Sequence, residues 1–206
     1  MSVKDNQVLA RTWLLPDQVD RLLEATDVFA PHLQLRNEVA VLLMYDLGLR
    51  VGELVGLDVD DVFLDDDEPY VYLRSEIQKA PPNGMVPDPA PLNLTRELGT
   101  ARLLRHYLNG RWKDSEALLP SQKSDRMGTE QVRNVVRRLA IEAGVEPRLA
   151  EGGTGSPQDV TPHTLRHSVF YRMFVEGDAK LKEVSLRLRH GSVATTERIY
   201  AHVIRR

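Results

Sequence analysis

Apolar residues recur at helical spacing along most of this chain, so the pattern predicts a mainly helical protein. Residues 15–29 carry their apolar side chains on one face, which is typical of a helix that lies on a core. Residues 34–47 are apolar on nearly every side, which predicts a buried central helix that Gly48 interrupts. Further helices are predicted at 51–56, 96–109, 129–143, 162–176, 179–188 and 193–203.

One part of the chain has the pattern of β-strands. Short runs at 59–64, 70–74 and 86–94 predict three strands, separated by turns with the sequences D-D-D-E and P-P-N-G. Residues 145–160 are rich in glycine and predict a flexible loop. The predicted fold class is therefore α+β, mainly helical with a small three-stranded antiparallel sheet.

The composition predicts one soluble globular domain over 11–206, preceded by a polar tail at 1–10. Hydrophobic residues make up 42% of the chain and charged residues 28%, which is ordinary for such a domain. No apolar run approaches the ~18 residues of a membrane span. The chain has no cysteine, which excludes disulfides and thiolate metal sites and makes a cytoplasmic location the expectation.

Charge is distributed unevenly along the chain. Residues 1–100 carry 8 Lys and Arg against 18 Asp and Glu, a net charge of −10, whereas residues 101–206 carry 19 against 12, a net charge of +7. A chain of this kind can present a basic face to a polyanion although its overall net charge is −3. The alternative is that these charges belong to ordinary solvated helices.

The segment T-P-H-T-L-R-H combines a helix start with titratable and cationic side chains. Thr161 is a good N-cap and Pro162 a good first helical residue. His163 then lies in the first turn, where free backbone N–H groups favour an anion, and Arg166 shares its helix face. The alternatives are a capped helix with a structural role only, or a metal site made by His163 and His167, although no carboxylate or thiol accompanies that pair.

Arg50 is an unusual permanent charge, because it follows directly on the most apolar segment of the chain. A guanidinium suits a phosphate, since its planar fork donates two parallel hydrogen bonds. The alternative is a local ion pair with Glu53, three residues further along. Glu53 can also do both, by holding a neighbouring arginine in place.

Three motifs resemble the catalytic boxes of the tyrosine recombinases, also called phage-type integrases. They read L-G-L-R-V-G-E-L at 47–54, H-T-L-R-H at 163–167 and R-H-G-S-V-A-T-T-E-R-I-Y-A-H-V at 189–203. R-T-W-L-L-P-D-Q-V-D-R-L-L at 11–23 resembles the segment that usually opens their catalytic domain. The resemblance covers nearly the whole chain, with the boxes in the family's order.

The resemblance implies a role for six residues in breaking a phosphodiester. An arginine pair holds the scissile phosphate, one histidine is the general base or proton relay, and a second histidine donates to a phosphate oxygen. A tyrosine is the nucleophile, and a lysine on the β-hairpin is the general acid for the leaving 5′-hydroxyl. In that order, these residues are Arg50 and Arg166, His163, His190, Tyr200 and Lys79.

Two of these assignments compete with plainer interpretations. Tyr200 is also suited to packing in the core, next to Ile199 and Val203. Lys79 is the only lysine of its region, but the hairpin Q-K-A-P-P-N-G at 78–84 departs from the family's short form. A free tyrosine has a pKa of roughly 10, so attack at neutral pH requires a base or a strongly cationic site.

The chain departs from the family in further respects. Arg189 stands where a glycine usually precedes the histidine of the last box, and its charge either contacts DNA or distorts the turn. We expect no separate N-terminal core-binding domain before residue 11. Few residues follow Tyr200, which favours a chain that is mainly monomeric without DNA and meets other protomers, as a tetrameric synapse, on DNA.

The function predicted from these residues is that of a site-specific DNA recombinase or integrase of a prokaryote or its virus. It cleaves and rejoins double-stranded DNA through a 3′-phosphotyrosine, without a metal or any other cofactor and without a membrane. One alternative is a DNA relaxer that resembles type IB topoisomerases. The others are a catalytically silent DNA-binding module and a helical scaffold that binds no DNA.

Overall fold

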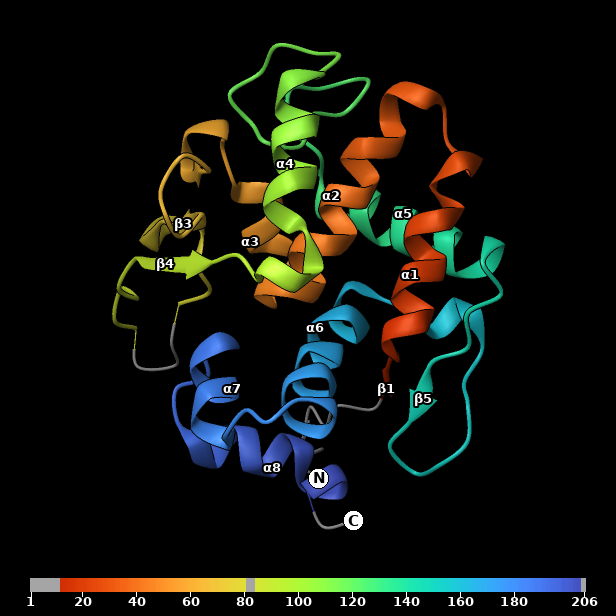
Figure 1. The fold of residues 1–206 in the computed structure, drawn as a ribbon, viewed down its shortest axis with the longest axis vertical. Coiled ribbons are helices and arrows are strands. Elements are labelled where there is room, and N and C mark those ends of the chain that lie inside the picture. Colours follow the sequence, from red (N-terminus) through yellow and green to blue (C-terminus); the bar gives the residue numbers. More distant parts are fainter. Residues whose placement is uncertain (1–11, 81–83, 205–206) are drawn as a thin grey trace, which may run out of the picture.

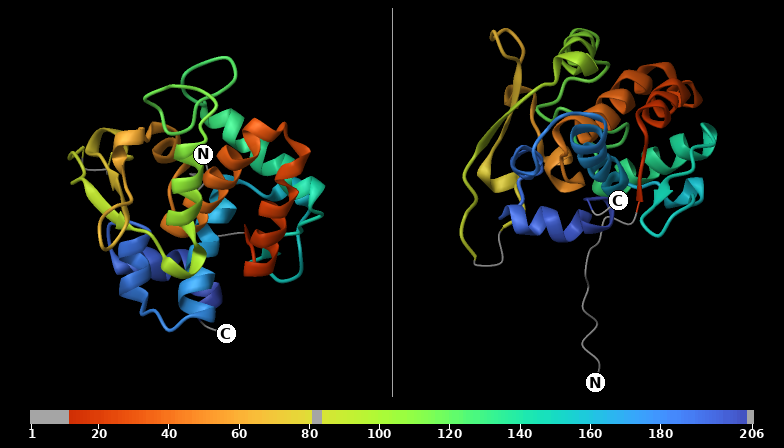
Figure 2. Two further views of the ribbon diagram at one scale, coloured as in Figure 1. Left: turned by 45° about the horizontal axis from the view of Figure 1, so that its top comes forward. Right: turned by 60° about the horizontal axis from the view of Figure 1, so that its bottom comes forward.

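The computed structural model describes residues 12–80 and 84–204, and Figure 1 shows their arrangement. Helices α2 (Pro31–Leu47) and α6 (Pro162–Phe170) pack against each other at the centre. The three-stranded sheet lies on one side of this pair, and α1 and α5 lie on the other (Figures 1 and 2). The predicted tail at 1–10 and the turn residues 81–83 lie outside the described part.

Helix α2 confirms the prediction of a buried central helix. Its apolar side chains are buried on all sides, and even its last two turns are closed off from solvent. Gly48 ends the helix with a φ of +60°, which favours glycine. A Cβ at this position would lie 2.8 Å from the side chain of Leu188, so only glycine allows the approach of that segment.

The helices around this centre follow the predicted pattern closely. Helices α1 and α5 have one apolar face each and bury it against the core, and α4 packs on α2 from the side of the sheet. Gly99 and Gly110 flank α4. The bounds are α1 Pro16–Glu24, α3 Val51–Gly56, α4 Thr100–Asn109 and α5 Thr129–Glu142, with short 3₁₀ helices at Ala25–Val28 (η1) and Arg96–Leu98 (η4).

The predicted three-stranded antiparallel sheet is present, with shorter strands. It has the order β2-β3-β4, and Val71 of β3 pairs with Val62 of β2 and Leu92 of β4. The first run begins as a 3₁₀ helix (η2) instead of a strand, because the Asp61 carboxylate accepts from the backbone N–H of Asp58. The bounds are η2 Val59–Asp61, β2 Val62–Phe63, β3 Tyr70–Leu73 and β4 Ala90–Asn93.

A second, two-stranded sheet was not predicted. Strand β1 (Thr12–Trp13) pairs antiparallel with β5 (Arg148–Leu149), and η5 (Pro157–Asp159) follows in the predicted loop. Strands of two residues are too short to show an alternating pattern. This sheet ties the start of the described chain to the segment before α6.

The last part of the chain forms a small core of its own below the central pair. Helix α6 continues as a π-helical turn, η6 (Tyr171–Glu176), instead of the single α-helix that was predicted. Helices α7 (Leu181–Arg187) and α8 (Val193–Ile204) follow, and they pack against each other and against the end of α6 (Figure 1). The buried residues of this core are Val169, Phe170, Val184, Leu188 and Tyr200. None of the described helices is both long and apolar enough to cross a membrane.

Candidate active site

Three segments that are distant in sequence meet where α2, α6 and α7 end. They are the start of α3, the part of α6 that carries Arg166 and His167, and the turn between α7 and α8. Arg166 of α6 is the centre of this group, because Arg50, Arg189 and Tyr200 all interact with it electrostatically. The structure therefore brings the predicted arginine pair and the predicted tyrosine to one place.

Arg166 is held by backbone carbonyl groups on two sides. It is almost fully buried, and its two terminal nitrogens donate to the carbonyl oxygens of Gly48 and Leu188. Burial, followed by the charges of Arg50 and Arg189, lowers the pKa of Arg166 to about 9, so the side chain remains charged at neutral pH. The left-handed turn at Gly48 thus fixes the plane of the guanidinium.

Arg50 caps helix α3 together with Glu53. Glu53 accepts a hydrogen bond from the Arg50 backbone N–H at 2.7 Å and from its guanidinium at 2.6 Å. The Glu53 side chain is 1% exposed, whereas that of Arg50 is 27% exposed. The local ion pair anticipated as an alternative is therefore real, and it leaves part of the Arg50 side chain open to solvent.

Arg189 adopts a backbone conformation that usually requires glycine. Its φ is +51°, and its side chain is turned inward, 11% exposed. It donates to Glu53 at 2.6 Å and to the carbonyl oxygens of Leu47 and Gly48 at 3.1 and 3.2 Å. The turn thus keeps the backbone conformation of a glycine, and the charge of Arg189 pairs with Glu53 inside the protein. A contact of this charge with DNA stays a prediction.

Glu53 is the negative centre of this group of arginines. Burial alone would raise its pKa, but Arg189 and Arg50 outweigh burial and hold the pKa below its usual range. The possibility that Glu53 holds a neighbouring arginine is confirmed, since it binds both Arg189 and Arg50. Three guanidinium groups face one carboxylate here, so the site keeps an excess of positive charge.

His190 is oriented by a buried threonine. Its Nδ1 lies 2.7 Å from the hydroxyl of Thr196, which is fully buried on α8. Burial, with the charges of Arg166 and Arg50, lowers the pKa of His190 to about 4. The ring is therefore neutral at neutral pH. A neutral imidazole still carries one N–H group, which can donate to a phosphate oxygen.

Tyr200 is both a core residue and a member of the site. It is 2% exposed, and its ring stacks on Phe170 with centroids 3.8 Å apart. Burial raises its pKa, and the charge of Arg166 opposes this only in part. The anticipated packing role is thus present. Tyr200 lies in the small core with Phe170, and Ile199 packs against that core. The side chain of Val203 lies outside the described part.

His167 contacts the hydroxyl group of Tyr200, and the sequence had not predicted this contact. Its Nδ1 lies 3.0 Å from the Tyr200 oxygen. The His163 ring stacks against the ring of His167 with centroids 6.1 Å apart, as the spacing of four residues on α6 allows. His163 is exposed as a whole, yet the protein around its ring, with the charges of Arg166 and Arg50, lowers its pKa.

Lys79 lies near the site, on an exposed loop. It follows the 3₁₀ helix η3 (Ser75–Ile77) in the connection between β3 and β4. Its charge is one of those that lower the pKa of His163. The assignment of Lys79 as general acid stays a prediction.

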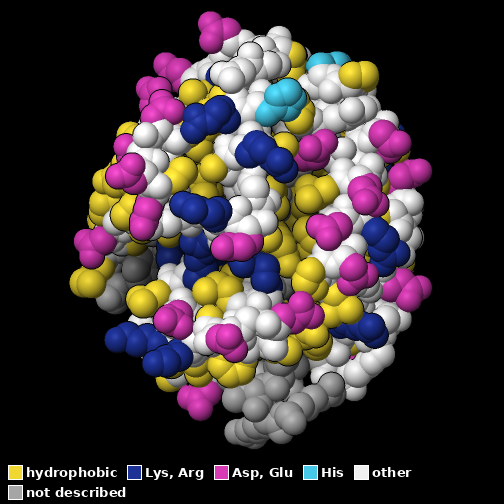
Figure 3. Space-filling model, in the orientation of Figure 1, with side chains coloured by type: hydrophobic (Ala, Val, Ile, Leu, Met, Phe, Trp, Pro, Cys, Tyr) yellow, Lys and Arg dark blue, Asp and Glu magenta, His cyan; other side chains and the backbone are white. Residues whose placement is uncertain are grey.

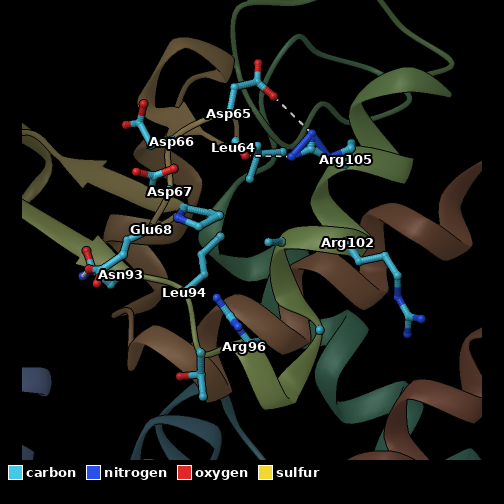
Figure 4. A pocket seen from close by; sticks show the side chains of 14 residues that line it. Leu64, Asp65, Asp66, Asp67, Glu68, Asn93, Leu94, Arg96, Arg102 and Arg105 are labelled. Carbon is cyan, nitrogen blue, oxygen red and sulfur yellow. Dashed lines mark hydrogen bonds and ion pairs between the residues drawn. The ribbon is translucent and has the colours of Figure 1, made fainter.

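A cavity elsewhere on the surface contains none of these residues. It has a volume of about 740 Å³ and lies between the acidic turn after β2 and helix α4 (Figure 4). Arg105 crosses it to donate to Leu64 and to pair with Asp65, an exposed pair that contributes little stability. In residues 12–80 and 84–204, no three His, Asp or Glu side chains are grouped so that they could hold a metal ion.

Comparison with known proteins decides the family. A sequence model described as the phage integrase family matches residues 12–206. The chain belongs to this family. It is 32% identical over 190 residues to tyrosine recombinase XerD of Oceanobacillus iheyensis, covering 92% of this chain and 57% of that protein. The chain thus spans little more than half the length of this relative, a tyrosine recombinase.

Solved structures have the same fold. The crystal structure of XerA recombinase matches 100% of this chain and 65% of its own, with a TM-score of 0.71 and 23% identity. The pre-cleavage complex of the XerH site-specific recombinase with its difH substrate matches 97% of this chain and 53% of its own, with a TM-score of 0.69 and 19% identity. The predicted fold class is confirmed by these likenesses.

Proposed function

We propose that this chain is the catalytic part of a site-specific DNA recombinase that cuts and rejoins strands through Tyr200. Membership of the phage integrase family supports this, and so does one feature of the site. Arg166, an anchored cation, lies within electrostatic reach of the Tyr200 hydroxyl group. A phosphodiester held by that cation would present its phosphorus to the tyrosine oxygen.

The scissile phosphate is bound by Arg50 and Arg166 in this proposal. Arg50 reaches solvent and makes the first contact, whereas Arg166 is fixed by two carbonyl oxygens and supplies a preorganised charge. His190, held by Thr196, donates to a non-bridging oxygen. These groups offset the negative charge that gathers on the phosphate in the transition state.

The reaction is a transesterification with balanced atoms. The Tyr200 oxygen attacks phosphorus and loses its proton, the bond from phosphorus to the 5′-oxygen breaks, and Lys79 protonates that oxygen. The 3′-phosphotyrosine keeps the energy of the original bond, so a 5′-hydroxyl from a second strand can reverse the step. His163, exposed beside these groups, passes protons to solvent.

Double-stranded DNA is the partner that the proposal requires, and the solved XerH complex with difH supports it by analogy of fold. Exchange of strands further requires other copies of the chain on the same DNA. A relaxer of the topoisomerase kind has the same cleavage chemistry, so two assays separate these functions. Recombinant product from two sites supports the recombinase, and relaxation of supercoiled DNA without such product supports the alternative.

Covalent capture tests the proposal. The chain is incubated with nicked suicide DNA, from which the cleaved strand diffuses away, and the mixture is denatured and separated by size. The unaltered chain and Tyr72→Phe, which changes an exposed tyrosine of the sheet, are expected to give a DNA-linked band. Tyr200→Phe keeps its packing on Phe170 and is expected to give none. A band from Tyr200→Phe would remove Tyr200 from the role.

A further inference from the structure

The structure offers the Tyr200 hydroxyl a partner that the six predicted residues do not include. His167 Nδ1 lies 3.0 Å from that oxygen, which is within the range of a hydrogen bond. The two rings meet edge to face, with centroids 5.8 Å apart and planes at 79°. We propose that His167 is a catalytic residue that accepts the proton of the Tyr200 hydroxyl as this oxygen attacks DNA. This inference rests on the function proposed above.

The other histidines of the site are placed less well for this task. The His190 ring lies 6.4 Å from the Tyr200 ring between centroids, and its Nδ1 is engaged by Thr196 at 2.7 Å. The His163 ring is next to His167, 6.1 Å away between centroids, and the residue is exposed. His163 is therefore suited to pass a proton on to water after His167 has taken it.

Helix α6 supplies three parts of the reaction within five residues. Arg166 faces the position of the phosphate, His167 meets the hydroxyl, and Phe170 stacks flat on the tyrosine ring with an angle of 6° between the planes. The phosphate ligand and the proton acceptor are thus neighbours on one rigid element.

The chemistry of the step requires such an acceptor. Burial disfavours the tyrosinate, so the hydroxyl has to lose its proton during attack and not before it. A neutral imidazole in hydrogen-bond contact with the hydroxyl is suited to this transfer. The proton moves from the Tyr200 oxygen to Nδ1 of His167 while the oxygen bonds to phosphorus, and the 5′-oxygen leaves with a proton from Lys79.

The charges around His167 make the transfer depend on bound DNA. His163 and Tyr200 face the His167 ring, and Arg166 and Arg50 act on the neighbouring ring of His163. A negative phosphate bound by the two arginines would lie close to His167 and would favour its protonated form. Protonation of His167 is thereby coupled to occupancy of the site.

The rate of covalent adduct formation as a function of pH tests the inference. His167→Gln keeps a polar side chain but cannot accept a proton, and His106→Gln makes the same change at an exposed histidine of α4. The unaltered chain and His106→Gln are expected to gain rate as the pH rises through the titration of one group and then to level off. His167→Gln is expected to be slower by on the order of 10²- to 10⁴-fold and to lose that titration, its rate still rising at higher pH.

A second variant separates chemistry from folding. His167→Ala opens space beside the hydroxyl, and added imidazole is expected to restore its adduct, but not that of Tyr200→Phe. A misfolded chain cannot be rescued in this way. If His167→Gln matches His106→Gln in rate and pH profile, or if imidazole fails to rescue His167→Ala, the inference is wrong. If the unaltered chain forms no adduct, the proposed function falls, and this inference with it.

Discussion

At the scale of single residues, both arginines of the predicted pair are expected to matter for the rate of adduct formation, and the buried Arg166 is expected to matter for stability as well. Arg50→Lys and Arg166→Lys should each slow adduct formation by on the order of a hundredfold, because an ammonium cannot reproduce the planar fork. Arg166→Ala should also lower the urea midpoint of unfolding, since it removes the buried hydrogen bonds that Arg166 donates to the carbonyls of Gly48 and Leu188. Rates near that of the unaltered chain, with the fold intact by circular dichroism, would make both arginines structural.

Arg189 separates a backbone effect from a side-chain effect. Arg189→Gly accepts the left-handed backbone and loses the contact with Glu53, whereas Arg189→Ala loses the contact and keeps the strain. In urea, the glycine variant should therefore be more stable than the alanine variant by about 1 kcal/mol. Both should cleave more slowly than the unaltered chain, because Glu53 and with it Arg50 lose an anchor. Equal stability of the two variants would contradict the strain.

The lowered pKa of His190 predicts how stability responds to acid. The unfolded chain binds a proton at this histidine near pH 6.5, and the folded chain does so only near pH 4, so stability falls as the pH falls through that window. The lowered pKa of Glu53 acts in the same direction at still lower pH. Urea midpoints of His190→Asn should fall less steeply between pH 6.5 and 4.5. His106→Asn, on the exposed face of α4, should follow the unaltered chain.

The sequence predicted which residues lie together at the candidate site, but not which hydrogen bonds they make there. Box motifs were enough to predict that Arg50, Arg166 and Tyr200 gather at one site. The bond between His167 and Tyr200 was not predictable, because it depends on how α8 packs on α6. The inward turn of Arg189 was missed for a related reason, since a positive φ leaves no mark in a sequence when the residue is not glycine.

At the scale of elements, length and apolar pattern decided what could be predicted. Helix α2 was predictable because a long run of residues that is apolar on every side fits a buried helix better than other secondary structures. Strands β1 and β5 have two residues each, too few for any period. The π-helical turn η6 was not predictable, since its residues have the composition of an ordinary helix.

A buried carboxylate at the end of α2 connects this helix to α4 and α7 through hydrogen bonds. Asp46, at the end of α2, is fully buried and accepts from Thr100 of α4 at 2.6 Å and from Arg187 of α7 at 2.6 Å. Asp46→Ala leaves Arg187 without its buried partner, so it should lower the free energy of unfolding by about 3 kcal/mol or more. Asp65→Ala is the control, because its pair with Arg105 is exposed, and it should leave the urea midpoint unchanged. Equal effects would contradict the buried tie.

At the scale of the whole molecule, opposite charges are separated along the sequence, and positive charge gathers at the candidate site. Figure 3 shows several Lys and Arg side chains near the middle of one face, with Asp and Glu side chains spread over the same face. The acidic turn at Asp65–Glu68 lines the cavity beside α4, and no predicted site residue lies there. Among the described residues, Glu53 is the buried carboxylate that pairs with Arg50 and Arg189 at the candidate site. An anion that approaches the site is therefore attracted, although the chain carries a net charge of −3.

The positive charge of the candidate site predicts that binding to double-stranded DNA weakens steeply with salt. Each phosphate that the protein neutralises releases condensed counterions and adds about −0.9 to the slope of log affinity against log salt. Lys79→Gln removes an exposed charge next to the site and should make that slope shallower by about one. Arg105→Gln, whose charge is already paired with Asp65 beside the distant cavity, should leave the slope unchanged. The slopes are measured by fluorescence anisotropy with Tyr200→Phe, so that no covalent adduct forms, and a flat plot would contradict the polarised charge.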